Sequence, residues 1–292
     1  MLVTKLESLS NEILIDLIEN YINGVDIFIS LINQLNNRFD DLINRCKRFY
    51  SDFTGIRKSE FSFCMKLLSN NHNMITSLTL SERDTPGQIH SFLCSFRSFE
   101  QFKQLRRLHL DFDANSVDIM DQELHSILKT SIHTLSIKGK NVRLLFEFNC
   151  IVLAMLTLTK IRRFFLSIDI QPVFCYFPSL NLIKLEYLTI EGRDCTWNNV
   201  KEILKCATNI IYVNVRIIQE LSNSTELIND KQYNYKSLTK LHTLIFEFIN
   251  DYSSITFDQL VYYFNIMPNL HKLEIIYTAG QYRSYFNLEN VI

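Results

Sequence analysis

The six residues Leu185-Glu186-Tyr187-Leu188-Thr189-Ile190 decide the fold, because their apolar-x-x-apolar-x-apolar pattern occurs eight times along the chain. Successive copies start between 24 and 31 residues apart, which is typical of a repeat protein. Within each copy, apolar and polar residues alternate, and this alternation predicts a β-strand with one buried face. The other seven copies start at Ile75, Leu105, Ile132, Ile161, Ile210, Leu241 and Leu270.

The stretches between the copies have the spacing of amphipathic helices. Residues 196–206 and 256–267 each begin with a threonine that can cap a helix and continue with apolar residues at helical spacing. Residues 89–102 and 119–128 have the same spacing. Alternating strands and helices predict an α/β solenoid, with parallel strands on its concave side and helices on its convex side.

The N-terminal residues follow a different periodicity. Apolar residues in the range 13–21 recur at the spacing of one helix face, and Ser10 is a suitable N-cap before them. Asn23 and Gly24 predict the end of this helix, and a second helix is expected over residues 26–39. The two expected helices form a helical hairpin, which is too small to be stable by itself.

Composition excludes several classes of protein. The 292 residues are 47% hydrophobic and 21% charged, as in folded water-soluble proteins. The 30 Lys and Arg are balanced by 31 Asp and Glu, so we expect no nucleic-acid partner. The most apolar stretch, residues 144–158, is too short to span a membrane and predicts a buried helix, and the N-terminus lacks a signal-peptide pattern. We therefore expect no membrane partner.

The chain also lacks the motifs of common enzymes. Its seven cysteines include no Cys-x-x-Cys pair, and thiols so scattered predict a reduced protein of the cytoplasm and/or the nucleus. The six glycines form no phosphate-binding loop, and neither His-Glu-x-x-His nor Gly-x-Ser-x-Gly occurs. We expect no catalytic residue, no metal and no cofactor, and thus a binding protein rather than an enzyme.

The N-terminal stretch Leu6-Glu7-Ser8-Leu9-Ser10-Asn11-Glu12-Ile13-Leu14, with Arg38-Phe39 behind it, resembles an F-box. F-box sequences typically begin Leu-Pro-x-Glu-Ile-Leu, and Ser10 stands here in place of the proline. An F-box followed by leucine-rich-type repeats is similar to the F-box and leucine-rich-repeat family. In that family the F-box binds a Skp-family adaptor, which binds a cullin scaffold, and the repeats hold a protein substrate for ubiquitin transfer.

The resemblance implies three regions. Residues 1–45 would be the F-box-like helical domain, 46–73 a linker or helical cap, and 74–292 a solenoid of about eight leucine-rich-type repeats. The repeats are degenerate, because most lack the usual asparagine after the strand. Adaptor-binding residues, or residues supporting the helices that bind, would be Leu9, Glu12, Ile13, Leu14, Ile18, Tyr21, Asp26 and Leu31. Alternatively, the same helices only cap the open end of the solenoid.

Candidate substrate-binding residues are the side chains that alternate outward along the strands. We expect the rings of Phe165, Tyr187 and Tyr212 to line up on neighbouring strands about 5 Å apart, with charged residues beside them. Aromatic residues with a charged edge are typical of interface hot spots, although ordinary strand residues that cover one another would give the same pattern. The candidates are Arg107, His109, Asp111, Phe165, Asp169, Tyr187, Glu191, Tyr212 and Arg216.

Overall fold

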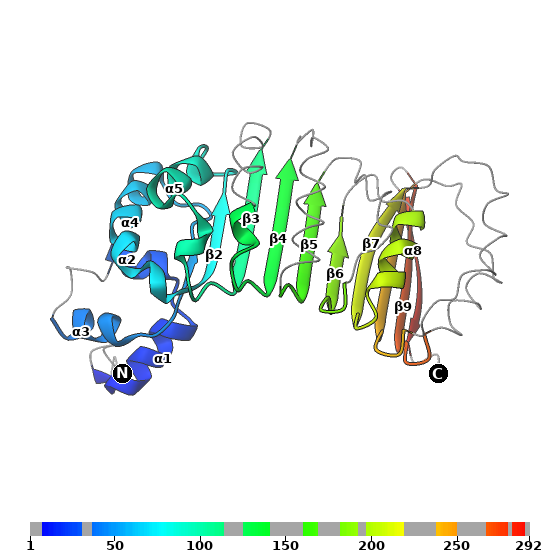
Figure 1. The fold of residues 1–292 in the computed structure, drawn as a ribbon, viewed down its shortest axis with the longest axis horizontal. Helices are drawn as coiled ribbons and strands as arrows, with labels where there is room; N and C mark the ends of the chain where they lie inside the picture. Colours follow the sequence, from blue (N-terminus) through cyan, green and yellow to red (C-terminus); the bar gives the residue numbers. More distant parts are fainter. Residues whose placement is uncertain are drawn as a thin grey trace. The chain divides into compact units, whose positions relative to one another are not determined.

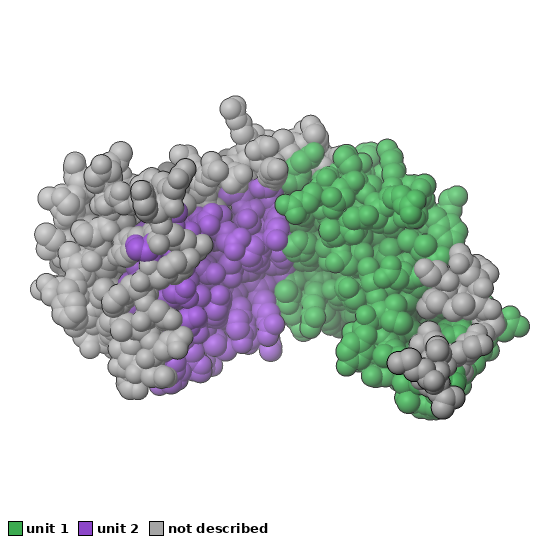
Figure 2. Space-filling model, turned by 180° about the vertical axis from the view of Figure 1, so that it is seen from behind, with its two compact units in different colours: residues 1–134 green, residues 135–292 purple. Residues whose placement is uncertain are grey.

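The computed structural model describes residues 8–30, 37–113, 125–140, 160–168, 182–191, 197–218, 238–249, 267–279 and 282–289. The chain divides into two compact units, residues 1–134 and residues 135–292 (Figure 2). The predicted helix at 144–158, most of the one at 256–267, and the candidates Leu31 and Asp169 lie outside the described residues.

The first unit contains three parallel strands in the order β1-β2-β3. Their bounds are Phe49–Asp52 for β1, Ile75–Ser81 for β2 and Arg107–Asp113 for β3. The register pairs Leu78 with Leu108, and both side chains are buried. Apolar positions of successive copies are thus stacked in one core, as the repeat pattern predicts.

In the second unit the strands also follow one another in sequence order, from β4 to β10. Figure 1 shows β4 and β5 pointing the same way, and the pairs from β5 to β9 are parallel. The last strand, β10, is antiparallel to β9. The bounds are Thr134–Lys140, Arg163–Ile168, Tyr187–Ile190, Tyr212–Ile218, Thr243–Ile249, Lys272–Ala279 and Tyr282–Glu289 for β4 to β10.

The α/β class is confirmed, and each of the eight predicted copies overlaps one of the strands β2 to β9. The sequence pattern missed β1, which lies inside the range expected to be a linker or cap. Its copy starts at Cys46, 29 residues before Ile75, and continues with Phe49 and Ser51. All three side chains are buried. Ser51 is polar, whereas the third position of every other copy is apolar, so the apolar pattern did not include this strand.

The described helices between strands are α4 (Lys58–Asn71), α5 (Gln88–Phe96) and α8 (Trp197–Cys206), with short 3-10 turns η2 (His72–Met74) and η3 (Phe99–Gln101). Helix α5 ends earlier than the predicted residue 102, because Arg97 adopts a left-handed backbone conformation with φ 58°. In the predicted helix at 119–128, residues 125–127 are helical. Helix α8 agrees with the predicted stretch 196–206.

The N-terminal helices are α1 (Asn11–Asn20), α2 (Gly24–Ser30) and α3 (Asn37–Arg45). Ser10 caps α1 as expected, since the Ile13 N–H lies 3.5 Å from its Oγ. The single second helix expected over 26–39 is replaced by α2 and α3, on either side of residues 31–36, which are outside the described residues. Helix α1 packs on both α3 and β1.

Helix α2 covers the free edge of β1. The Asn23 amide donates to the Asp52 carbonyl (2.8 Å), and its Oδ1 accepts from the N–H groups of Asp52 (2.9 Å) and Val25 (3.1 Å). Asn23 thus pairs with β1 much as a neighbouring strand would, and it also caps α2. A Cβ on Gly24 would lie 2.8 Å from the Ser51 Oγ and 3.0 Å from the Tyr50 carbonyl oxygen, so a larger residue here would have to displace β1. Such cover protects an edge strand from unwanted pairing.

Replacing Asn23 by alanine is expected to lower the free energy of unfolding by about 1–3 kcal/mol, because two backbone groups of β1 and one of α2 lose their partner. Urea unfolding of the full chain measures the loss. Asn23→Asp is the matched variant: it keeps the acceptor for the Asp52 and Val25 N–H groups but sets a carboxylate oxygen against the Asp52 carbonyl, so the stability it loses reports the donated bond. Equal stability of the alanine variant and the wild-type protein would show that Asn23 does not hold this edge.

Candidate functional site

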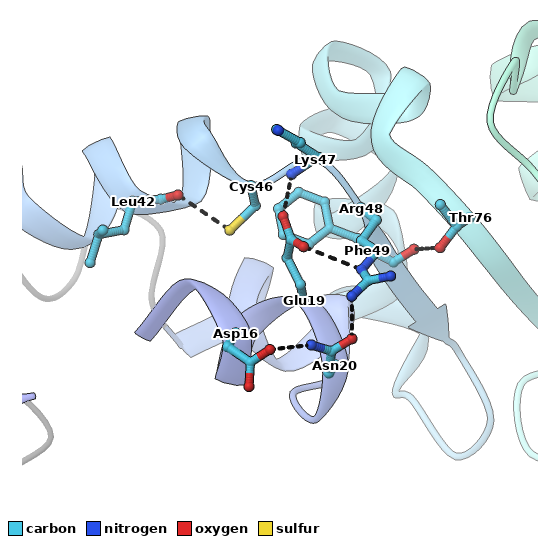
Figure 3. Close-up of polar contacts among 9 residues, drawn as sticks. All are labelled: Asp16, Glu19, Asn20, Leu42, Cys46, Lys47, Arg48, Phe49 and Thr76. Carbon is cyan, nitrogen blue, oxygen red and sulfur yellow. Dashed lines mark hydrogen bonds and ion pairs between the residues drawn. The ribbon is translucent and has the colours of Figure 1, made fainter. Parts of the chain in front are cut away.

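The C-terminal end of α1 is tied to the segment that enters β1 (Figure 3). The Glu19 carboxylate accepts a hydrogen bond from the Lys47 N–H (2.6 Å) and pairs with the Arg48 guanidinium (3.2 Å). Arg48 also donates to the Asn20 amide oxygen (2.6 Å), and Asn20 donates to Asp16 (2.7 Å). These contacts fix the last turn of α1 against the first strand.

The N-terminal end of α1 is fixed by Arg38 of α3. Its Nε donates to the Asn11 side-chain oxygen (2.9 Å), and its Nη2 donates to the Leu9 carbonyl (2.6 Å). Hydrogen bonds from a charged guanidinium are among the stronger ones in proteins. With both ends held, α1 presents its outer side chains in a fixed orientation.

The predicted adaptor-binding residues differ in their exposure. Leu14 and Ile18 are buried and support the helices. Ile13 and Tyr21 are 50% and 73% exposed, which leaves them free to contact a partner. Of the rest, Glu12 and Asp26 are exposed and Leu9 is half-buried. The apolar surface available for docking therefore lies on the side of α1 next to the one that builds the core.

Glu12 stays charged at the start of α1. Hydrogen bonds from its own backbone N–H and from the Ser10 side chain lower the pKa of its carboxyl below the usual range. A carboxylate in the first turn of a helix interacts favourably with the helix dipole. Glu12 thus adds an exposed negative charge one residue before Ile13.

Two described thiols are poor nucleophiles. Burial, helped by Glu19, raises the pKa of Cys46 to about 11, and burial raises the pKa of Cys64 to about 12. A thiol reacts as its thiolate, so both are inert at neutral pH. Cys94, by contrast, is exposed. Cys206 is half-buried.

Along each strand from β5 to β8, side chains that are not buried alternate with the buried anchors. The side chains that are not buried point to one face of the sheet, which we call the open face. The register places Arg163, Tyr187 and Tyr212 next to one another on β5, β6 and β7. The two tyrosine rings lie 6.3 Å apart between centroids. The Arg163 guanidinium carbon lies 4.5 Å above the centre of the Tyr187 ring, a cation–π contact.

The predicted alignment of Phe165 with the two tyrosines is wrong by two residues. Phe165 pairs in register with Thr189, and Arg163 takes the expected place beside Tyr187. The buried anchors Phe164 and Leu188 are register partners, so the outward residue that precedes each anchor shares a row. Phe165 still contributes to the open face, because the Lys138 Nζ lies 5.2 Å from the centre of its ring.

The charged candidates near the tyrosines differ in their partners. Arg216 pairs with Glu247 on the neighbouring strand (2.9 Å), and Glu247 also accepts from the Thr278 hydroxyl (3.1 Å). Glu191 directly follows β6 and is exposed. Arg216 thus links β7 to β8, and its positive charge is neutralised by Glu247.

The remaining candidates lie in the first unit, on β3. Arg107 is exposed, whereas His109 and Asp111 are half-buried. Their register partners on β2 are the small polar residues Ser77, Thr79 and Ser81. No aromatic side chain stands in these positions of β2 and β3, so this part of the first unit lacks the feature that favours an interface in the second.

The turns that precede neighbouring strands are joined by hydrogen bonds that the sequence pattern did not predict. Asn209 donates to the Ile183 carbonyl (2.7 Å), and Asn269 donates to the Thr239 carbonyl (2.5 Å). Lys240 donates to the Asn209 side-chain oxygen (2.7 Å). Both asparagines directly precede the first apolar residue of their copy, which is a signal in the sequence. They join neighbouring repeats where the usual asparagine after the strand is missing.

Comparison with known proteins adds no assignment. No protein-family model matches the chain, and no curated protein matches its sequence. Over the described residues, no group of three or more His, Cys, Asp or Glu is placed to hold a metal ion. None of the described helices is long and apolar enough to cross a membrane. The function proposed below therefore rests on the geometry and on the residues that resemble an F-box.

Proposed function

We propose that this protein is a substrate-recognition adaptor of a cullin-type ubiquitin ligase. In this proposal the N-terminal helices bind a Skp-family adaptor, which links the chain to a cullin scaffold, and the repeats bind a target protein. The observation that carries it is the state of α1: both of its ends are held by hydrogen bonds, yet Ile13 and Tyr21 remain exposed.

The exposed side of α1 has the pattern of a helix that docks through apolar anchors. Ile13 and Leu17 are four residues apart and lie along one side of the helix, and the exposed Tyr21 follows as the residue that ends α1. Leu17 between them is half-buried. Removing such side chains from water is the main driving force of helix-in-groove binding. The fixed position of α1 lowers the entropy cost of that binding.

The alternative is a repeat scaffold for protein interactions whose N-terminal helices only cap the first strand. The contacts of Asn23 and Gly24 with β1 favour a capping role. The two roles use different parts of the helices, because the cap is formed by the start of α2 and the docking side belongs to α1. A cap alone gives no reason for the exposed Ile13 and Tyr21.

Copurification of the full chain with a Skp-family adaptor tests the proposal. Ile13→Asp combined with Tyr21→Ala is expected to abolish the interaction, because it removes both exposed anchors. Aspartate is tolerated near a helix N-terminus, so α1 should stay folded. Phe63→Ala is the matched control, since Phe63 is an exposed apolar residue of α4, and it should copurify normally.

Two results would contradict the proposal. If the wild-type chain does not bind any Skp-family adaptor, the capping alternative is favoured. If the double variant binds as well as the wild type, the docking side is not on α1.

A further inference from the structure

Two cations on the open face of the second unit lie over aromatic rings. Arg163 lies above Tyr187, and Lys138 lies above Phe165. Within the described part of the chain, neither forms an ion pair with a carboxylate, and both are exposed. Two other cations of this face are neutralised, Arg216 by Glu247 and Lys272 by Glu274. The unpaired positive charges therefore coincide with the aromatic residues.

A ring holds a cation in place without neutralising it. The electron-rich face of the ring attracts the charge, while the N–H groups at the edge of the guanidinium remain available as donors. Arginine in this arrangement is already oriented, so less side-chain entropy is lost when it binds a carboxylate through two hydrogen bonds. Arg163 is thus prepared for an anionic group.

The rings beside these cations form an apolar platform. Tyr187 and Tyr212 are register partners, and both are half-buried, as is Phe165. Partly buried aromatic side chains are rigid and are common anchors at interfaces. We call Lys138, Arg163, Phe165, Tyr187 and Tyr212 together the basic aromatic patch.

We propose that the basic aromatic patch binds an acidic segment of the partner protein, in which Asp or Glu residues and large apolar residues stand two positions apart. This inference rests on the proposed function and names the class of segment that the repeats recognise. Carboxylates would pair with Arg163 and Lys138, and the apolar side chains would pack on the rings of Tyr187 and Tyr212. In an extended peptide, side chains two positions apart point to the same side, so an acidic residue and the apolar residue two positions after it can reach neighbouring places on the patch.

A single-stranded nucleic acid also combines anions with rings that stack, but the charges of the face oppose it. Nucleic-acid grooves need a line of cations that follows the phosphates. Here Arg216 and Lys272 of the same open face are already paired with Glu247 and Glu274, and Glu191 adds an exposed carboxylate. Two unpaired cations suit a short acidic peptide better than a phosphate backbone.

Fluorescence anisotropy of the full chain with a labelled peptide that repeats Glu-Ser-Phe-Ser tests the proposal. The comparison peptide has Gln in place of Glu and keeps the apolar residues. We expect the Gln peptide to bind about tenfold more weakly, because it lacks the charge-assisted hydrogen bonds. Raising the salt concentration should weaken only the Glu peptide.

Variants locate the site. Arg163→Gln and Lys138→Gln should each lower the affinity for the Glu peptide several-fold, up to about tenfold. Lys184→Gln is the matched control, because it removes the same charge from an exposed turn before β6 and should leave the affinity unchanged. Tyr187→Ala should also weaken binding of the Gln peptide, and circular dichroism checks that the variant is folded.

The inference is overturned if neither peptide binds, if both bind equally, if Lys184→Gln weakens binding as much as Arg163→Gln, or if single-stranded oligo-dT binds more tightly than the Glu peptide. The proposed function fails separately, because copurification with the Skp-family adaptor depends on Ile13 and Tyr21. Arg163→Gln should leave that copurification unchanged.

Discussion

Phe92→Ala is expected to lower the free energy of unfolding of the first unit by about 3–5 kcal/mol. Phe92 of α5 has 0% exposure. Its ring centroid lies 4.9 Å from that of Phe96, 5.7 Å from that of Phe99 and 5.5 Å from that of Phe102. Removing this ring leaves a cavity at the centre of an aromatic cluster, which joins α5 to the turn before β3.

Hydrogen exchange of the β2 and β3 amides in the full chain measures this loss, and urea unfolding checks it. Phe63→Ala is the matched control: the same substitution is made on α4, but the ring is 46% exposed, so the cost should stay below about 1 kcal/mol. Similar losses in the two variants would mean that the aromatic cluster does not stabilise the unit.

The strands were predictable because each copy needs the same buried anchors. In the copy at 185–190, Leu185, Leu188 and Ile190 are all buried. A further buried residue, Leu182, accepts the Leu185 N–H in the turn before the strand (3.0 Å), and the same bond joins Leu241 to Leu238 (3.1 Å). Because these side chains all enter one shared core, apolar residues recur at regular intervals in the sequence.

Elements that break the period were not predictable. Strand β1 has Ser51 at an anchor position, and its burial depends on the contact with α2, which is distant in the sequence. Strand β10 pairs antiparallel with β9 and does not follow the repeat pattern. The early end of α5 depends on the backbone conformation of a single residue, Arg97.

The candidate sites were only half predictable for a related reason. The sequence identifies which residues of a strand point outward, but the row that they share depends on the register, which moved Phe165 away from Tyr187 and brought Arg163 there. On α1, Ile13 and Leu14 are both apolar neighbours within the F-box-like motif. Which of them faces the core is decided by the packing of α3 and β1, because both elements contact the same helix.

Leu14→Asp is expected to unfold α1, with a loss of more than about 3 kcal/mol, because it places an unpaired charge in the core. Leu14 is 1% exposed and lies on the side of α1 that builds the core with Ile18. Ile13→Asp is the matched control, since the same substitution one residue earlier reaches water and should cost little stability. Hydrogen exchange of the α1 amides in the full chain distinguishes the two variants.

Both variants should lose the Skp-family adaptor, but for different reasons. Ile13→Asp removes an exposed anchor while the α1 amides keep their protection. Leu14→Asp removes the helix itself, so its amides should exchange rapidly. If Leu14→Asp instead keeps full protection and loses only the adaptor, then Leu14 contacts the partner directly, and the docking surface is the side of α1 that the structure places against the core. If Ile13→Asp loses protection as well, the exposed stripe is needed for folding, and the loss of adaptor binding would say nothing about docking.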